Sequence, residues 1–132
     1  MGAPGAGKGT QAKRIAERYR IPHVSTGEIL RLHMRNNSAL GQEAKAYIDE
    51  GHLVPDDVVN RIVEERLAYC DDTATGFILD GFPRSLAQAR ELDAILARRG
   101  ESLEIALNLA VQDEELVERL VARRQCPKCG EI

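Results

Sequence analysis

The chain has 132 residues, a length that fits one domain. Hydrophobic residues make up 43% and charged residues 30%, which suits a globular protein and argues against a disordered or low-complexity chain. The net charge of -3 gives no electrostatic basis for nucleic-acid binding. No apolar stretch approaches the roughly 18 residues of a membrane-spanning helix, and no signal peptide is recognisable. We therefore expect a cytoplasmic protein without nucleic-acid or membrane partners.

The hydrophobic pattern predicts helices alternating with short strands. Apolar residues recur at helical spacing in the segments 10–20, 26–34, 39–50, 56–70, 85–99 and 113–124. Short β-prone or continuously apolar runs predict strands at 21–25, 77–79 and 105–111. This alternation is typical of an α/β protein with a parallel sheet and helices on both faces.

Several residues are interpreted as structural. Asp56 and Asp113 are expected as N-caps, and Ser85 with Gln88 has the spacing of a capping box. Helix ends are expected before two glycines, Gly51 and Gly100. Packing or other structural roles are expected for His23, His33 and Cys70.

A glycine-rich segment opens the chain and contains the G-x-x-x-x-G-K core of a phosphate-binding loop. Residues 2–10 read Gly-Ala-Pro-Gly-Ala-Gly-Lys-Gly-Thr. Glycine permits the dihedrals that turn backbone N–H groups toward a phosphate, and a helix behind the loop directs its positive end at the anion. Lys8 is expected to reach the outer phosphates and the Thr10 hydroxyl to help hold Mg²⁺. The alternative is a flexible glycine-rich terminus.

In this motif the loop follows a strand, whereas only Met1 precedes Gly2. We therefore expect the chain to begin inside a central strand of its sheet. Neighbours of a missing central strand keep unpaired backbone groups, which cost about 1–3 kcal/mol each when buried. Net domain stability is only about 5–15 kcal/mol. The chain by itself is thus expected to fold poorly and to be inactive.

Together with four further segments, the glycine loop resembles the adenylate kinase family over essentially all 132 residues. The segments are Val-Ser-Thr-Gly-Glu-Ile-Leu-Arg at 24–31, Gly-His-Leu-Val-Pro-Asp at 51–56, Leu-Asp-Gly-Phe-Pro-Arg at 79–84 and Glu-Arg-Leu-Val-Ala-Arg-Arg at 118–124. The resemblance implies an incomplete P-loop nucleoside-monophosphate-kinase-like fold. Its core would comprise 1–24 and 55–122, an AMP-binding insertion about 25–54, and the start of a lid 123–132.

On the ATP side, the resemblance implies phosphate binding by the glycine loop and two arginines. These residues are Gly5, Ala6, Gly7, Lys8, Gly9, Thr10, Arg119 and Arg123. Stabilisation of charge on the transferred phosphoryl group would fall to Lys8, Arg84, Arg119 and Arg123. Thr10 and Asp80 would hold the Mg²⁺ of Mg·ATP, through water.

On the AMP side, the resemblance implies binding by Thr26, Arg31, His52, Leu53, Val54, Gly81, Phe82, Pro83, Arg84 and Gln88. Arg31 would meet the phosphate and Gln88 the adenine edge. Simpler alternatives stay open for single residues. Arg31 could be a surface residue on a solvated helix face, and Asp80 could serve only to form a turn. Arg119 could belong to a surface ion-pair network with partners four residues away.

Near the end of the chain, Cys126 and Cys129 form a C-x-x-C pair. Such a pair supplies half of a tetrahedral zinc site, which needs two more ligands. The resemblance implies the zinc-bearing lid of some adenylate kinases. Structural Zn²⁺ is therefore expected only in the full-length protein, with the half-site in this chain empty.

The activity implied is reversible phosphoryl transfer, in which ATP and AMP give two ADP, in nucleotide homeostasis. The partners would be these small molecules, with Mg²⁺ accompanying ATP, and the full-length protein would be a monomer. Three alternatives remain: a kinase for UMP or CMP, a non-catalytic ATP-binding module, and a zinc-ribbon interaction protein.

Overall fold

Two short parallel strands form the centre of the molecule. The structure is a computed structural model that describes residues 1–68, 73–124 and 126. Strand β1 (His23–Ser25) pairs with β2 (Ile78–Asp80), and Val24, opposite Leu79, is buried. Both strands were expected, with bounds one or two residues different. The α/β class and the parallel pairing are therefore confirmed.

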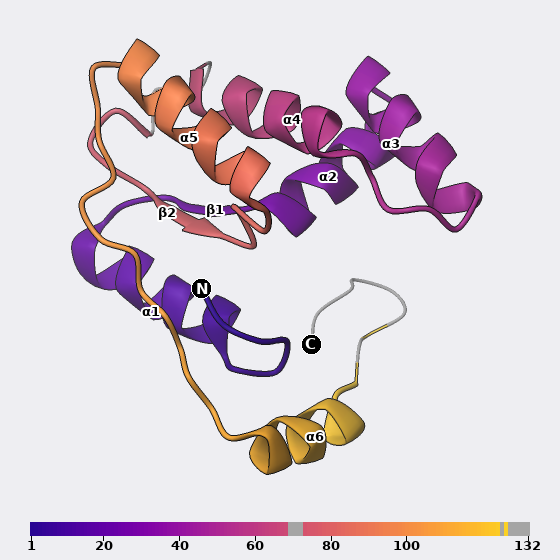
Figure 1. Cartoon of the computed structure of the whole chain (residues 1–132), viewed down its shortest axis with the longest axis vertical. Helices are drawn as coiled ribbons and strands as arrows, with labels where there is room; N and C mark the ends of the chain where they lie inside the picture. Colours follow the sequence, from indigo (N-terminus) through magenta and orange to yellow (C-terminus); the bar gives the residue numbers. More distant parts are fainter. Residues whose placement is uncertain (69–72, 125, 127–132) are drawn as a thin grey trace.

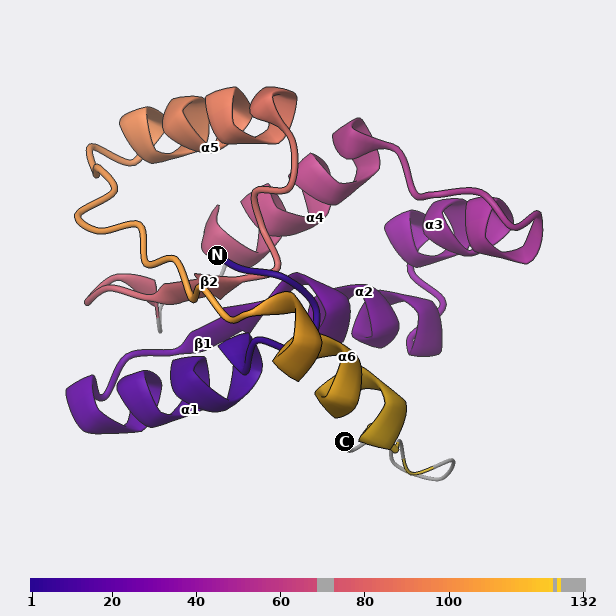
Figure 2. The same ribbon diagram turned by 60° about the horizontal axis from the view of Figure 1, so that its bottom comes forward.

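The expected helices all form. Their bounds are α1 (Lys8–Tyr19), α2 (Thr26–Arg35), α3 (Ala39–Asp49), α4 (Asp56–Ala68), α5 (Leu86–Arg98) and α6 (Asp113–Ala122). Figure 1 shows α1 on one side of the strands and α4 with α5 on the other, and the turned view agrees (Figure 2). The helices α2 and α3 extend beyond the carboxyl end of β1. In the described parts of the chain, no helix is both long and apolar enough to cross a membrane.

The prediction of a third strand at 105–111 is wrong. Among the described residues this segment makes a single parallel bridge, between Leu109 and Gly2. The Leu109 N–H donates to the carbonyl oxygen of Met1 at 2.8 Å. A strand needs a partner along its length, and the described backbone contacts of this segment are with Met1 and Gly2. Two of its apolar side chains remain largely exposed, Ile105 by 70% and Leu107 by 53%.

Helix ends follow the expected chemistry at some positions. Gly51 and Gly100 have left-handed φ angles of 76° and 70° directly after the C-caps, and the Ser85 hydroxyl accepts from the Gln88 N–H at 3.1 Å. The N-cap predictions for Asp56 and Asp113 are wrong, because both lie within the first helical turn. In that turn their negative charges interact favourably with the positive end of the helix dipole.

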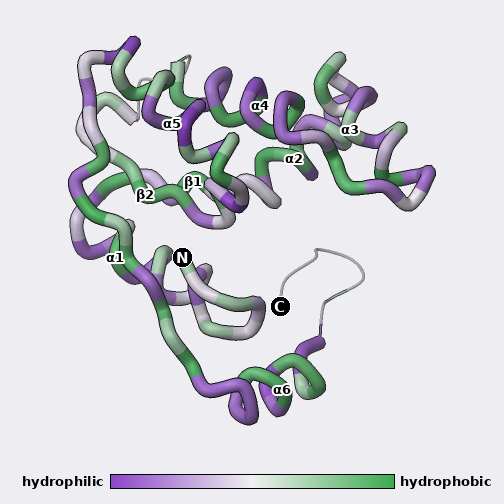
Figure 3. Tube along the Cα trace, in the orientation of Figure 1, coloured by the Kyte–Doolittle hydropathy of each residue, from purple (hydrophilic) through white to green (hydrophobic). Residues whose placement is uncertain are grey.

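Two hydrophobic clusters stabilise the fold. The larger lies between α4, α5 and β2 and consists of Val63, Leu67, Phe82, Leu92, Ile95 and Leu96. The smaller joins α3 to α4 through Ala44, Val58 and Ile62, with α2 residues packed against it. Figure 3 shows the corresponding hydrophobic stretches along α4 and α5. The segment 26–54 thus has its own apolar contacts, which α4 shares.

Among the structural predictions, the role of His33 is confirmed: its Nδ1 lies 2.8 Å from the Ser38 hydroxyl between α2 and α3. Cys70 falls outside the described residues.

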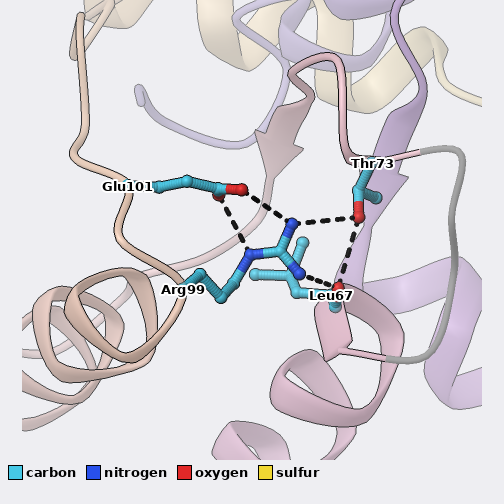
Figure 4. A network of polar contacts seen from close by, with 4 residues as sticks. All are labelled: Leu67, Thr73, Arg99 and Glu101. Carbon is cyan, nitrogen blue, oxygen red and sulfur yellow. Dashed lines mark hydrogen bonds and ion pairs between the residues drawn. The ribbon is translucent and has the colours of Figure 1, made fainter.

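A polar network beside the larger cluster joins three parts of the chain (Figure 4). The Arg99 guanidinium donates to the Leu67 carbonyl at the end of α4, and to the Thr73 hydroxyl at 3.4 Å. Its other contacts are two 3.0 Å bonds to the Glu101 carboxylate. The Arg99 side chain is only 19% exposed. It therefore fixes the end of α4 against the segment that follows α5.

Replacement of Arg99 by alanine is expected to lower the free energy of unfolding by about 1–3 kcal/mol. The Leu67 carbonyl loses its charged donor and is left with the Thr73 hydroxyl at 3.2 Å, and the bonds of Arg99 to Thr73 and Glu101 are lost as well. The matched control is Arg98→Ala. Arg98 pairs with Glu64 and Glu91 at the surface, where ion pairs contribute little. Urea denaturation followed by circular dichroism compares the two variants. Equal losses of stability would contradict this assignment.

Candidate nucleotide-phosphate site

The glycine loop forms a turn at the start of α1. Gly5 and Gly7 have left-handed φ angles of 83° and 86°, which favour glycine. The Ala6 N–H donates to the Ala3 carbonyl at 3.2 Å, and the helix begins at Lys8. The Lys8 ammonium lies over the loop and donates to the carbonyls of Gly2 and Ala3, each at 2.8 Å. A cation and a helix N-terminus therefore converge on one loop, which is the arrangement that binds phosphate.

The carboxylate of Asp80 lies against this loop. A Cβ atom on Gly9 would lie 3.5 Å from Asp80 Oδ2, so the end of β2 and the start of α1 are in close contact. The same oxygen is 3.3 Å from His23 Nε2, and the Asp80 side chain is only 16% exposed. Thr10 is the next residue along α1. The site thus has a carboxylate and a hydroxyl near the loop, the oxygen donors that Mg²⁺ prefers.

A second loop leaves β2 directly after Asp80. Gly81 has a φ of 83°, and a Cβ there would lie 2.8 Å from Thr26 Oγ1 and 3.1 Å from Arg84 Nη2. Only glycine fits this position. Arg84 Nε donates to the Gly81 carbonyl at 2.7 Å, while Thr26 Oγ1 donates to the Asp80 carbonyl at 3.3 Å. The peptide bond between Phe82 and Pro83 is cis.

The exposed guanidinium of Arg31 approaches from α2. This helix begins at Thr26, immediately after β1, and a Cβ on Gly27 would lie 3.3 Å from Arg31 Nη1. Arg31 therefore extends back over the first turn of its helix. Arg31 and Arg84 both belong to segments that leave the carboxyl ends of parallel strands, where α/β proteins bind ligands.

Gln88 is buried, with 4% of its surface exposed, and both the nitrogen and the oxygen of its side-chain amide form hydrogen bonds. Its Nε2 donates to Asp56 Oδ1 at 2.6 Å, and its Oε1 accepts from the Arg84 N–H at 2.7 Å. The Ser85 hydroxyl donates to the other Asp56 oxygen at 2.6 Å. Asp56 thus connects the start of α4 to the loop that carries Arg84. In a complete capping box Gln88 Oε1 would accept from the Ser85 N–H. It accepts from the N–H of the preceding residue, Arg84, so only the Ser85 half of the predicted capping box forms.

The remaining predicted site residues lie at different places. The helix α6 contacts the glycine loop: Arg119 Nη1 donates to the Gly5 carbonyl at 3.3 Å, and Leu120 faces Gly5. Arg119 also pairs with Glu115, four residues earlier. The pair with Glu115 fits the surface-network alternative, and the bond to Gly5 places Arg119 beside the glycine loop. Arg123 is exposed at the C-cap of α6.

The segment after α3 carries three predicted AMP-site residues that the structure does not bring to the two loops. His52 is exposed and lies 3.4 Å from Glu50, and Leu53 is 93% exposed. Val54 packs on the smaller cluster instead. Phe82 is 5% exposed and belongs to the larger cluster.

The predicted zinc pair is only partly described. Cys126 is exposed, and Cys129 lies outside the described residues. Within the described part of the chain, no group of three or more histidine, cysteine, aspartate or glutamate side chains is placed to hold a metal ion. The described residues therefore do not make up a closed tetrahedral zinc site.

Two contacts near the site were not predicted from the sequence. His23 was interpreted as structural, and its Nε2 lies 3.3 Å from the Asp80 carboxylate, a partner that the sequence did not indicate. Asp56 was expected to cap a helix, yet it holds Ser85 and Gln88. Both contacts join residues more than 25 positions apart, and no local pattern in the sequence encodes them.

A lysine-bearing glycine loop at a helix N-terminus, beside an aspartate that ends a parallel strand, defines a P-loop α/β phosphate-binding protein. The family model described as adenylate kinase matches residues 1–126. The chain therefore belongs to the adenylate kinase family.

Curated relatives agree with this family. Adenylate kinases of Caldanaerobacter subterraneus subsp. tengcongensis, Thermoanaerobacter pseudethanolicus and Limosilactobacillus reuteri are 54%, 55% and 56% identical to the chain over 130 residues. Each alignment covers 98% of this chain and 58%, 59% and 59% of the relative, respectively. The chain thus spans somewhat more than half the length of the relatives it matches.

Asp56→Asn is expected to loosen the loop that carries Arg84, because the amide offers Ser85 and Gln88 one neutral acceptor in place of two charged ones. The expected loss of unfolding free energy is about 1–3 kcal/mol. Amide hydrogen exchange should increase between 81 and 88. Asp57→Asn is the matched control, since it removes the same charge from the same helical turn. A similar exchange increase in both variants would show that the helix dipole, and not the network, is responsible.

Proposed function

We propose that the chain is the phosphate-binding part of an adenylate kinase, which transfers a phosphoryl group reversibly between ATP and AMP. The observation that carries this proposal is the contact between two phosphate-type loops at the end of β2. Gly9 of one loop abuts Asp80, and the loop bearing Arg84 begins at the next residue. A protein that only binds ATP has no need of a second cationic loop beside the first.

Residues 5–10 would hold the ATP phosphates, with Lys8 at the outer ones. In the described structure the Lys8 ammonium rests on two loop carbonyls, so it is close enough to change partners when an anion enters. Thr10 and Asp80 would hold Mg²⁺ through water. When it is bound with ATP, this ion would neutralise part of the negative charge of the phosphates. Arg119 lies against Gly5 and would add a guanidinium on the same side.

The AMP phosphate would lie between Arg31 and Arg84. Guanidinium groups suit phosphate because they donate pairs of parallel hydrogen bonds. Thr26 Oγ1 and Arg84 Nη2 both lie close to Gly81, and Arg31 lies over Gly27, the residue after Thr26. Transfer then requires no nucleophilic side chain, because positioning and charge stabilisation carry most phosphoryl-transfer catalysis.

AMP is favoured over UMP and CMP by Gln88, since a carboxamide matches the donor–acceptor edge of adenine. The names of the curated relatives also support AMP. Gln88 would have to turn part of its amide toward the base, and its bonds to Asp56 and Arg84 fix where that amide lies.

We further propose which segments of the chain correspond to the AMP-binding insertion and the lid of the whole protein. Residues 25–54 would form the AMP-binding insertion, and the apolar cluster that α2 and α3 share with α4 supports their packing as one unit on the start of α4. His52, Leu53 and Val54 would line the base on closure of that insertion. Arg123 would stand at the lid hinge, with Cys126 and Cys129 as the first two ligands of a structural zinc site. The full-length protein would act as a monomer in the cytoplasm.

Binding measurements on the chain separate the two phosphate sites. Lys8→Ala is expected to weaken Mg·ATP binding about tenfold, which corresponds to about 1.4 kcal/mol, and to leave AMP binding unchanged. Arg84→Ala is expected to do the reverse. The matched controls are Lys13→Ala on α1 and Arg90→Ala on α5, both exposed. Titration calorimetry with Mg·ATP, AMP, CMP, UMP and GMP gives the affinities and the base preference.

If the chain bound CMP or UMP as tightly as AMP, the proposal would change to a kinase for another monophosphate. If Lys8→Ala and Arg84→Ala each abolished binding of both Mg·ATP and AMP, the proposal of two separate phosphate sites would be contradicted. A coupled assay for ADP provides a second control. The chain alone is expected to form no ADP above the Lys8→Ala level, and turnover above that level would contradict the expected inactivity.

A further inference from the structure

Two partners of opposite hydrogen-bonding character hold the side-chain amide of Gln88 in one orientation. Its Nε2 donates to Asp56 Oδ1 at 2.6 Å, and its Oε1 accepts from the backbone N–H of Arg84 at 2.7 Å. A carboxylate only accepts and a backbone N–H only donates, so the amide nitrogen has to face Asp56 and the amide oxygen has to face Arg84. A half-turn of the amide would replace both hydrogen bonds by contacts between like groups. The amide of Gln88 therefore has a fixed donor end and a fixed acceptor end.

The contacts of Ser85 agree with the acceptor role of Asp56. The backbone N–H of Gln88 donates to Ser85 Oγ at 3.1 Å, which leaves the hydroxyl hydrogen of Ser85 for another acceptor. The Ser85 hydroxyl donates that hydrogen to Asp56 Oδ2 at 2.6 Å. Both carboxylate oxygens of Asp56 therefore accept, one from Ser85 and one from Gln88. Because only 4% of the Gln88 surface is exposed, water has little access to replace these partners.

The amide of Gln88 keeps hydrogen-bonding capacity beyond these two contacts. A carboxamide has two N–H groups and two oxygen lone pairs. Among the residues that the structure describes, Asp56 takes one N–H and Arg84 takes one lone pair. One donor and one acceptor remain for a ligand, and their order is set by the two residues that hold the amide. A base that meets Gln88 would therefore meet a donor and an acceptor in a fixed arrangement.

A fixed order of donor and acceptor distinguishes purines by the group at carbon 6. Adenine carries an amino group there, which donates, whereas guanine and hypoxanthine carry an oxygen, which accepts. The amide oxygen of Gln88 would pair with the amino group of adenine. It would repel the oxygen of a 6-oxo purine unless the amide turned. Sites built to hydrogen-bond one ligand reject an analogue that leaves their buried polar groups unpaired.

We propose that Asp56 is a specificity-determining residue, which selects 6-amino over 6-oxo purine monophosphates by fixing the orientation of the Gln88 amide. The inference rests on the proposed function, since it requires Gln88 to meet the base of the monophosphate. Asp56 acts through Gln88 and is thus a positioning residue. The Arg84 N–H fixes the other end of the amide, so the loop that carries the Arg84 guanidinium also takes part in base selection.

The test compares AMP with IMP, which have the same ribose and phosphate and differ at the edge of the base that carries carbon 6. Titration calorimetry on the whole 132-residue chain measures both affinities, and their ratio is the readout. A variant that is only partly folded binds both nucleotides more weakly by the same factor. The ratio therefore reports the orientation of the amide and not the stability of the chain.

Asp56→Asn is the main variant, because an amide can donate as well as accept and no longer dictates which end of Gln88 faces it. The unchanged chain is expected to bind AMP about tenfold more tightly than IMP, as one unpaired buried hydrogen-bonding group would cause. Asp56→Asn should lower this ratio by about threefold or more. Two matched controls should leave the ratio unchanged. Asp57→Asn removes the same charge one residue later, and Ser85→Ala loosens the same network but keeps the carboxylate.

A double variant tests whether Asp56 acts through Gln88. In Gln88→Ala the ratio should approach one, and the addition of Asp56→Asn should not change it further. A further change in that background, an unaltered ratio in Asp56→Asn, or an equal fall of the ratio in the two controls would each overturn the inference. A chain that binds AMP and shows one of these results contradicts this inference alone. A chain that binds neither nucleotide contradicts the proposed function and this inference together.

Discussion

The contact between Gly9 and Asp80 is the constraint on which the rest of the site depends. A Cβ at Gly9 would lie 3.5 Å from Asp80 Oδ2, so the first turn of α1 lies directly against the end of β2 and a carboxylate stands beside the glycine loop. The chain then turns at Gly81, where only glycine fits, and presents Arg84 from the next loop. Two loops that carry cationic side chains are thereby held at one end of the two-stranded sheet that the structure describes. Neither the helices nor the arginines would place them together without this close approach.

The contact between the two loops also determines where the charged side chains of the site lie. Lys8 and Arg119 lie on the side of the glycine loop, and Arg31 and Arg84 on the side of the loops that leave β1 and β2. The carboxylate of Asp80 stands between them, restrained by His23. Cationic side chains near an acidic residue are the groups that bind phosphates together with a divalent ion. Supporting contacts such as Asp56 to Ser85 and Gln88 keep the second loop in place.

Much of the local structure around this candidate site could be predicted from the sequence because its signals are local. Helical periodicity, the glycine loop and the glycines that end α3 and α5 each depend on a few neighbouring residues. The segment 105–111 has the apolar pattern of a strand, yet strand formation depends on a partner elsewhere in the chain. The partners of His23, Asp56 and Arg99 likewise follow from the tertiary packing. Arg119 shows the same limit: its spacing indicated a surface network, and only the packing of α6 shows that it also reaches Gly5.

The central claim is that the ATP and AMP phosphates bind side by side at the end of β2. Paramagnetic relaxation tests it directly, with Mn²⁺ and a non-hydrolysable ATP analogue bound to the chain and the phosphorus of AMP observed by NMR. We expect strong relaxation of the AMP phosphorus that disappears when Lys8→Ala removes the analogue. An AMP phosphorus that binds the chain and relaxes no faster with Mn²⁺ and the analogue present would contradict the claim.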